Sequence, residues 1–496
     1  MQYTSTRDKS VKVTASQAIV KGISDDGGLF VPCEFPFISP EKLEELSKLG
    51  YKERAKYVLS LYLTDFTKEE IDYCVEGAYK DGKFSSDEIA PLYELNGNFV
   101  EELWRGPTCA FKDMALQLLP YLLTVSASKS AKDKTIVILV ATSGDTGKAA
   151  LEGFKDVKNT KILVFYPNDG VSPMQKLQMT TQEGENVSVC AINGNFDDAQ
   201  SGVKAIFTNK EIEQRLKENN MQFSSANSIY WGRLVPQVVY NISAYCDLLK
   251  NKKINLGDKI NIVVPTGNFG NILAAYYAKQ MGLPVNRFIC ASNKNNVLTD
   301  FIKTGEYNKN RQFFTTSSPS MDILISSNLE RLLFELHSKD DKKVCECMAS
   351  LLKEGKYVIS NDVHEKLLSQ FDAGCCDDDE TLETIKETFE NENYLIDTHT
   401  AVGVKVYNEY VKNTLDKTPT VIASTANPYK FSSSVLKAVA PGEKVDNEFD
   451  TVEAVAKITK VECPKQLASL KGKQPRFTQV CEKSDMTKVV FDMLKI

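Results

Sequence analysis

The stretch Arg105-Gly-Pro-Thr-Cys-Ala-Phe-Lys-Asp-Met-Ala-Leu-Gln117 places a lysine where a turn passes into a helix. Gly106 and Pro107 favour the turn, and Thr108 belongs to a residue type that often caps a helix N-terminus. The apolar residues that follow recur at helical spacing, at Ala110, Met114, Leu118, Leu119, Leu122 and Leu123. The sequence therefore predicts a helix that begins near Thr108 and carries Lys112 near its first turn.

Lys112 would occupy an unfavourable position for a permanent positive charge. The helix dipole disfavours a cation at this end, and apolar neighbours penalise the ammonium form. Both effects lower the pKa of a lysine, which is what an amine that attacks a carbonyl group requires. The alternative is a lysine that extends from a surface helix into solvent, which is the usual state of a lysine.

Continuous apolar runs that follow this stretch are typical of strands buried on two faces. They are residues 134–141, 161–167, 187–192, 259–264, 287–291 and 418–425, and helical patterns separate most of them. The alternation predicts an α/β fold with two doubly wound open sheets and a small, mainly helical N-terminal domain. The expected domain ranges are 1–95, 96–255 and 256–496.

Three local features complete the expected architecture. Ser39-Pro40 is a suitable N-cap and first position for a helix, and a single strand is expected near 92–100. The acidic run 377–380 is expected to be a solvated turn between helices. The polar tail after Gly442 is expected to be a surface extension.

The loop Thr142-Ser-Gly-Asp-Thr-Gly-Lys-Ala149 follows the first buried run and must be compared with a nucleotide-binding P-loop. Thr142 stands where that motif needs its first glycine, and Ala149 stands where it needs a hydroxyl, so a nucleotide triphosphatase is not expected. Glycines and hydroxyls at a helix start can still bind a carboxylate or another small anion. Hydroxyls that merely cap the helix are an equally good interpretation.

A second loop, Gly267-Asn-Phe-Gly-Asn271, follows the run 259–264 and offers backbone amides at a helix start. The two glycines let the backbone approach a ligand closely, and the dipole favours a phosphate there. A nucleophilic lysine, an anion loop and a phosphate loop together suggest a Schiff base to pyridoxal phosphate. Thr425, at the end of the last run, could place a hydroxyl opposite the cofactor ring nitrogen.

Composition narrows the classes of partner. The net charge is −6, and neither a basic run nor an apolar run of about 18 residues occurs, so we expect no nucleic-acid or membrane partner. Without a secretory pattern at the N-terminus, the twelve cysteines are expected to be reduced thiols in a cytoplasmic protein. Cys345-x-Cys347 and Cys375-Cys376, with His337 and His364, lack the usual zinc-ligand spacing, so no metal site is expected.

Several short motifs, in order over nearly the whole chain, resemble those of threonine synthase from the branch found in fungi and many bacteria. They are Tyr3-x-Ser5-Thr6-Arg7, Asp25–Pro32, the Lys112 stretch, Ala141–Gly147, Ser225–Ile229 with Trp231-Gly-Arg233, Pro265–Asn271, Pro319–Asp322 and Ala423–Pro428. The resemblance implies a fold-type II pyridoxal phosphate enzyme that converts O-phospho-L-homoserine and water to L-threonine and phosphate. A monomer or a homodimer is expected.

The resemblance also implies site residues. Lys112 would be the catalytic, cofactor-bound lysine, and the remaining cofactor contacts would come from Gly267, Asn268, Phe269, Gly270, Asn271 and Thr425. The substrate carboxylate would be surrounded by Thr142, Ser143, Asp145 and Thr146. The substrate phosphate needs a second anion site, for which the candidates are Arg233, Ser225, Asn227 and Ser172. Arginine suits this role because its fork pairs two phosphate oxygens.

The sequence departs from the family pattern at Tyr230, Asn427 and Tyr429, where asparagine, histidine and alanine are expected. Two other functions stay open at this point. One is a serine/threonine dehydratase or cysteine synthase of the same fold, which needs no second phosphate site. The other is a non-catalytic homologue that binds phosphorylated metabolites. His399 could line the site or could be a structural histidine.

Overall fold

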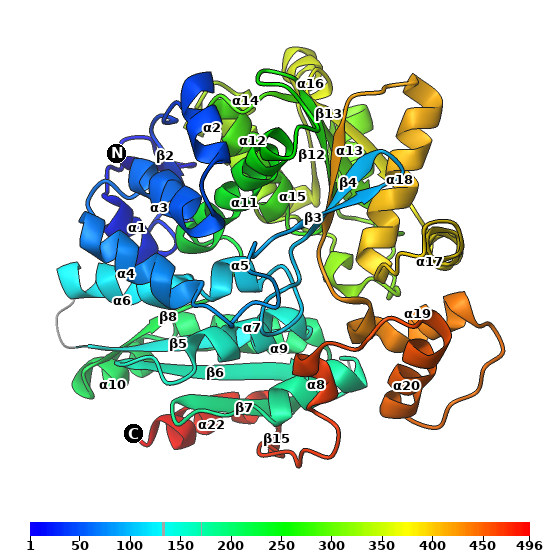
Figure 1. Cartoon of the computed structure of the whole chain (residues 1–496). Helices are drawn as coiled ribbons and strands as arrows, with labels where there is room; N and C mark the ends of the chain where they lie inside the picture. Colours follow the sequence, from blue (N-terminus) through cyan, green and yellow to red (C-terminus); the bar gives the residue numbers. More distant parts are fainter. Residues whose placement is uncertain (131–133, 170) are drawn as a thin grey trace.

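The computed structural model describes residues 1–130, 134–169 and 171–496, which form two open sheets with helices packed against them (Figure 1). The first sheet has the order β15-β7-β6-β5-β8, and all its strands are parallel. Its strands are β5 (Thr135–Ala141), β6 (Thr160–Pro167), β7 (Val187–Asn193), β8 (Met221–Ser224) and β15 (Val480–Glu482). It lies in the lower half of Figure 1, near the C-terminus.

The second sheet has the order β13-β10-β9-β14-β4-β3 and is parallel except for β3 at one edge. Its strands are β3 (Leu92–Leu95), β4 (Asn98–Glu102), β9 (Ile260–Pro265), β10 (Val285–Ser292), β13 (Phe371–Cys375) and β14 (Thr420–Ser424). The central strands β9 and β14 are buried along their whole length, as continuous apolar runs require. The predicted fold class is confirmed.

Helices cover the sheets and build the N-terminal region. That region holds β1 (Tyr3–Ser5), α1 (Ala15–Lys21), β2 (Phe30–Pro32), α2 (Pro40–Ser47), α3 (Tyr51–Tyr62) and α4 (Lys68–Ala78). Around the first sheet lie α5 (Asp113–Leu116), α6 (Leu119–Ser130), α7 (Asp145–Phe154), α8 (Pro173–Thr180), α9 (Phe196–Thr208) and α10 (Lys210–Glu218). The next helix, α11 (Trp231–Lys250), packs against α2 and α3 of the N-terminal region.

The second half of the chain continues the alternation. It contains α12 (Gly270–Gln280), α13 (Val297–Thr304), β11 (Glu306–Asn308), η1 (Pro319–Met321), α14 (Leu329–Leu336), α15 (Asp341–Glu354), β12 (Lys356–Val358), α16 (Asn361–Leu368), α17 (Asp378–Glu392) and α18 (Thr398–Thr414). After β14 come η2 (Pro428–Phe431), α19 (Ser432–Val439), α20 (Glu448–Thr459), α21 (Lys465–Ala468), η3 (Lys483–Asp485) and α22 (Met486–Leu494).

Local capping explains which helix boundaries the sequence predicted correctly. Ser39 caps α2 through its side chain, with Pro40 at the first position, as expected. Thr108 does not cap a helix, because its amide and hydroxyl both donate to the buried carboxylate of Asp113, at 2.8 Å each. The helix therefore begins at Asp113, and Lys112 is the residue just before it.

Three other expectations are wrong. The single strand near 92–100 is a hairpin, because Asn96 and Gly97 adopt the left-handed backbone (φ 52° and 76°) that a tight turn needs. The acidic run is no turn: Asp377 caps α17, and the next three acidic residues fill its first turn, where the dipole favours them. The polar tail is no surface extension, since β15 pairs with β7 and α22 is buried on one side.

Sheet pairing crosses the limits of the three predicted domain ranges. β3, from the range 1–95, pairs with β4 in the second sheet, and β15, from the range 256–496, joins the first sheet. The ranges remain a prediction from sequence. The consequence for the site is that the C-terminal segment helps to hold the first sheet in place.

The buried side of α22 gives a test of this role of the tail. Met486 is 1% exposed, and its sulfur packs so closely on Gly202 that a Cβ there would lie 2.3 Å away. We expect Met486→Ala to destabilise the protein by about 2–5 kcal/mol, because it leaves a cavity. The measurement is the midpoint of thermal unfolding. Leu352→Ala, at a residue that is 85% exposed, is the control and should change little. Equal midpoints would show that α22 is not part of the core.

Candidate functional site

Lys112 is held against the end of β14 by a short antiparallel contact. Ala110 forms an isolated bridge with Ala426, and the amide of Phe111 donates to the carbonyl of Thr425 at 2.8 Å. Next to this contact, the amide of Asn427 donates to the carbonyl of Cys109 at 3.0 Å. This contact places Lys112 and Thr425, which the sequence predicted for one site, on neighbouring segments at the carboxyl end of a parallel sheet.

The amine of Lys112 is almost fully enclosed. Its Nζ lies 3.1 Å from Ser320 Oγ and 3.5 Å from Asp145 Oδ2. Burial lowers the pKa of Lys112, the carboxylate of Asp145 opposes this change, and the positive charges of Lys430 and Arg233 add to the lowering. The net direction is downward, as the sequence predicted, and it increases the share of neutral amine available for attack on a carbonyl group.

Asp145 bridges two buried ammonium groups. Its Oδ1 lies 2.9 Å from Lys430 Nζ and accepts from Gln175 Nε2 at 2.9 Å. Burial raises the pKa of Asp145, but Lys430 and Lys112 together outweigh burial and hold the pKa well below its usual range. The group is therefore a carboxylate that pairs with both lysines. A negative charge here would repel a substrate carboxylate, so the geometry favours a clamp for Lys112 over the predicted carboxylate contact.

Lys430 was not identified from the sequence. It is fully buried in η2, where its Nζ also donates to the carbonyl of Thr108 at 2.9 Å and to Gln178 Oε1 at 3.0 Å. The sequence feature that could have identified it is its position in Asn427-Pro-Tyr-Lys430, directly after the predicted loop at Thr425. Its contacts tie η2, α8 and the Lys112 loop into one unit.

The loop Gly267–Asn271 opens α12 and lies beside the same serine. A Cβ on Gly267 would lie 2.7 Å from the carbonyl oxygen of Ser320, so no other residue fits without a shift. Phe269 has a left-handed backbone (φ 62°), and the loop's backbone amides donate to none of the described residues. Both polar side-chain atoms of Asn271 are buried without a partner in the described part of the chain. These free donors at a helix start form a suitable seat for a phosphate.

Arg233, on α11, is a second centre of positive charge. It is 2% exposed, its Nη1 donates to the carbonyl of Ala226 at 2.7 Å, and its Nε has no partner among the described residues. Burial lowers the pKa of Arg233 to about 10, and no described carboxylate forms an ion pair with it. A buried guanidinium without an acidic partner is costly unless an anion binds it, which indicates an anion site close to Lys112.

The remaining predicted residues divide into two groups. The hydroxyl of Thr142 accepts from the amides of Gly144 and Gly147, and Ser172 caps α8, so both are used within the fold. Ser225 accepts from the amide of Asn227, whose side chain is exposed. By contrast, Ser143 and Thr146 are half-buried and have no hydrogen bond through their side chains to any described residue, which leaves both hydroxyls available to a ligand.

His399 is a further residue near the amine, and its contacts are structural. Its Nδ1 lies 2.8 Å from Asp397 Oδ2, and its Nε2 accepts from the backbone amide of Ser320 at 3.1 Å. Nδ1 therefore carries the proton and donates to Asp397. Because Ser320 Oγ is the partner of Lys112, the pair of Asp397 and His399 fixes the segment that positions the amine.

The three departures from the family pattern also have structural explanations. Asn427 accepts from the amide of Tyr429 at 3.0 Å, and the buried Tyr429 donates to the carbonyl of Val461. The ring of Tyr230 packs so tightly on Gly22 that no side chain fits there. None of the three forms a described hydrogen bond or ion pair with Lys112, whose partners are Ser320 and Asp145.

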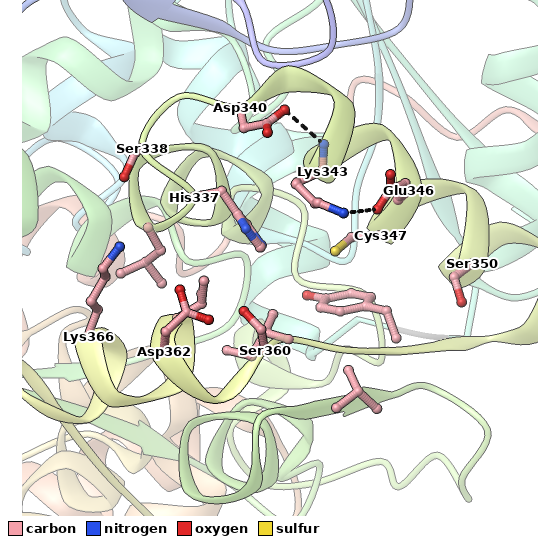
Figure 2. A pocket seen from close by; sticks show the side chains of 15 residues that line it. His337, Ser338, Asp340, Lys343, Glu346, Cys347, Ser350, Ser360, Asp362 and Lys366 are labelled. Carbon is pink, nitrogen blue, oxygen red and sulfur yellow. Dashed lines mark hydrogen bonds and ion pairs between the residues drawn. The ribbon is translucent and has the colours of Figure 1, made fainter.

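A separate hollow of about 490 Å³ lies on the outside of the second half of the chain (Figure 2). His337 and Cys347, two of the residues considered above as metal ligands, line it. Lys343 forms an ion pair there with Glu346 at 2.9 Å. Among the described residues, no group of three or more His, Cys, Asp and Glu side chains could hold a metal ion. None of the predicted site residues lines this hollow.

Comparison with known proteins agrees with the site. Family models match residues 2–79 (threonine synthase N terminus), 85–361 (pyridoxal-phosphate dependent enzyme) and 400–490 (threonine synthase, C-terminal). The lysine and the phosphate loop lie within the second match, so fold and site define a pyridoxal-phosphate-dependent enzyme. The chain belongs to the threonine synthase family.

Individual relatives support this placement. The threonine synthase of Pseudomonas aeruginosa is 38% identical over 440 residues, which is 88% of this chain and 90% of the relative. Human threonine synthase-like 1 is 42% identical over 447 residues, and the match covers 87% of this chain but only 59% of that longer relative. The structure of PLP-bound threonine synthase from Brucella melitensis superposes with a TM-score of 0.88 at 36% identity, and the match covers 100% of both chains.

Pyridoxal phosphate is the cofactor of this family, and the residues present fit it. Lys112 supplies the amine, the loop Gly267–Asn271 supplies free amides, and the unpartnered side chain of Asn271 can donate to a phosphate or a ring substituent. In the part of the chain that the structure describes, none of the helices has the length and apolarity needed to cross a bilayer.

The contact between His399 and Ser320 can be tested directly. His399→Gln can keep an acceptor for the Ser320 amide, whereas His399→Leu has similar volume and offers none. We expect the leucine variant to lose at least about tenfold in kcat and to show a changed pH dependence of the bound cofactor's absorbance, because an unmade buried hydrogen bond displaces Ser320. The glutamine variant should recover most of the kcat and most of the original pH dependence of the absorbance. Equal behaviour of the two variants would show that the contact does not position the amine.

Proposed function

We propose that this protein is a threonine synthase, which converts O-phospho-L-homoserine and water to L-threonine and phosphate. The observation that carries the proposal is Arg233, a buried guanidinium without an acidic partner whose charge acts on Lys112. The cofactor phosphate would be held at Gly267–Asn271, whose backbone amides lie at the start of α12. A second anion site therefore suits a substrate that brings a phosphate of its own.

Each predicted site residue receives a role in this proposal. The loop residues Gly267, Asn268, Phe269, Gly270 and Asn271 would hold the cofactor phosphate, and Thr425 would face the ring nitrogen. Ser143 and Thr146 would bind the substrate carboxylate, while Thr142 and Ser172 shape the loop and α8. Arg233 would bind the substrate phosphate, with Ser225 and Asn227 at its edge. Asp145 would hold Lys112 and Lys430.

The chemistry follows from what these side chains can do. When bound, pyridoxal phosphate withdraws electrons from the substrate's Cα and so stabilises negative charge next to it. Lys112, with a lowered pKa, would remove the proton from Cα and later one from Cβ. It would return a proton at Cγ after phosphate has left, and a proton at Cα after water has added at Cβ. Ser320 and Asp145 keep the amine aimed at these atoms. Arg233 neutralises the charge that grows on the phosphate as its bond to Cγ breaks.

The competing functions differ in what they need from Arg233. A serine/threonine dehydratase has no substrate phosphate to bind, and a non-catalytic homologue has no need of a reactive lysine.

We also propose a small-molecule substrate as the partner, a monomeric or homodimeric state and a cytoplasmic location. The assay measures phosphate release and threonine formation from O-phosphohomoserine, with L-serine as a parallel substrate. Deamination of serine without phosphate release would replace the proposal by the dehydratase.

Lys112→Ala tests the role of the amine. We expect turnover of O-phosphohomoserine to fall by at least about a thousandfold, since both the attachment of the cofactor and the proton transfers are lost. The variant should also lose the cofactor's absorbance band at the wavelength seen in the unmodified protein. Lys158→Ala, at an exposed lysine, is the control. Turnover retained in the Lys112 variant would remove this lysine from the mechanism.

Arg233→Met tests the second anion site. We expect KM for O-phosphohomoserine to rise by about 10–100-fold, because a charge-assisted pair with the phosphate is lost. The cofactor should stay bound, since the phosphate loop is intact. Arg233→Lys should recover part of the loss. An unchanged KM in the methionine variant would mean that the substrate phosphate binds elsewhere.

A further inference from the structure

A cavity of about 460 Å³ lies on the far side of α8 from Lys112, between this helix and the segment Pro475–Val480. Glu448 and Phe449 of α20 and Val480 of β15 line the cavity together with α8, and these elements lie near one another in the lower half of Figure 1. The amides of Arg476 and Phe477 both donate to the carbonyl of Thr180, which fixes the segment to the end of α8. The volume is that of a typical small-molecule site.

The walls of this cavity are largely apolar. Three aromatic rings, from Tyr166, Phe449 and Phe477, come from three separate parts of the chain, and Leu177 of α8 adds an aliphatic surface. Phe449, Phe477 and Leu177 are only half-buried, so apolar area remains accessible. A ligand with an apolar side chain would remove this area from water.

Two charged groups line the same cavity, and neither has a partner of opposite charge among the described residues. Lys176 Nζ contacts only Asn168, at 2.9 Å from its side-chain oxygen and 3.2 Å from its carbonyl. Glu448 Oε1 accepts from Ser432 Oγ at 2.6 Å, and no donor is placed on its other oxygen. Burial raises the pKa of Glu448, and a cation bound beside the carboxylate would lower that pKa.

The cavity is connected to the Lys112 site through two sets of contacts. Gln175 and Gln178, one helical turn apart on α8, bind Asp145 and Lys430, while Leu177 and Lys176 of the same helix face the cavity. On the other side, Glu448 binds Ser432, the residue that directly follows η2 and its Lys430. These contacts connect the walls of the cavity to Asp145 and to Lys430.

We propose that this cavity is a second ligand site, which binds an α-amino acid with an apolar side chain and thereby alters the environment of Lys112. The carboxylate of the ligand would pair with Lys176, its ammonium with Glu448, and its side chain would pack among the three rings. The effect on Lys112 rests on the proposed function, because Lys112 is there the reacting group. Coupling between two binding sites is reciprocal, so a ligand at either site changes the affinity of the other site for its own ligand.

The test uses the holoenzyme after borohydride reduction, which fixes the cofactor to Lys112 and prevents amino acids from reacting with it. Calorimetry measures the binding of L-phenylalanine, 3-phenylpropanoate and phenethylamine. We expect L-phenylalanine to bind with one site per chain, and each compound that lacks one charged group to bind at least about tenfold more weakly. No heat with L-phenylalanine, or equal affinity for the three compounds, would overturn the proposal.

Variants assign the binding to this cavity. Lys176→Met keeps the aliphatic stem and should weaken L-phenylalanine binding by at least about tenfold, whereas Lys158→Met, at an exposed lysine elsewhere, should not. The fluorescence of the reduced cofactor should change on binding in the unmodified protein. Equal affinity in the Lys176 variant would show that L-phenylalanine does not bind in this cavity. Fluorescence that does not respond to binding would show that the cavity does not influence the Lys112 site. Neither readout needs turnover, so a failure of the proposed function would leave both interpretable.

Discussion

The arrangement of the site depends on one buried carboxylate between two buried ammonium groups. Asp145 pairs with Lys430 at 2.9 Å and with Lys112 at 3.5 Å, and all three side chains are almost entirely removed from water. Such charges are costly to bury singly, and removing one partner from a buried group typically costs about 3–5 kcal/mol. The carboxylate therefore keeps both lysines in place, while their charges keep it ionised.

The fold brings these charges together from distant parts of the chain. Lys112 follows the hairpin of the second sheet, Asp145 begins the helix after β5, and Lys430 lies just beyond β14. The site thus sits where strand ends of both sheets meet, the usual place for ligands in open α/β sheets. Through Gln175 and Gln178, α8 contacts both Asp145 and Lys430, and its last residue, Thr180, accepts hydrogen bonds from the C-terminal segment.

Local patterns in the sequence were enough to predict the central strands of both sheets and to select Lys112 and the loop Gly267–Asn271 as candidate site residues. Continuous apolar runs such as 135–141 and 260–265 admit few other structures, and Gly267 marks a close backbone approach to Ser320. The pattern could not predict Lys430 or the pair of Asp397 and His399, because their partners are 285 and 79 residues away. It also missed β13, a short edge strand, and assigned a capping role to Thr108, whose hydroxyl binds Asp113 instead.

The most direct test of this account is the pKa of the Lys112 amine in the cofactor-free protein. Reductive methylation with ¹³C-formaldehyde gives each lysine an NMR signal, and the signal absent from Lys112→Met identifies the one from Lys112. The account predicts a titration midpoint clearly below the ordinary lysine value of about 10.4, because burial and the charges of Lys430 and Arg233 outweigh Asp145. A midpoint at or above the ordinary value would contradict it.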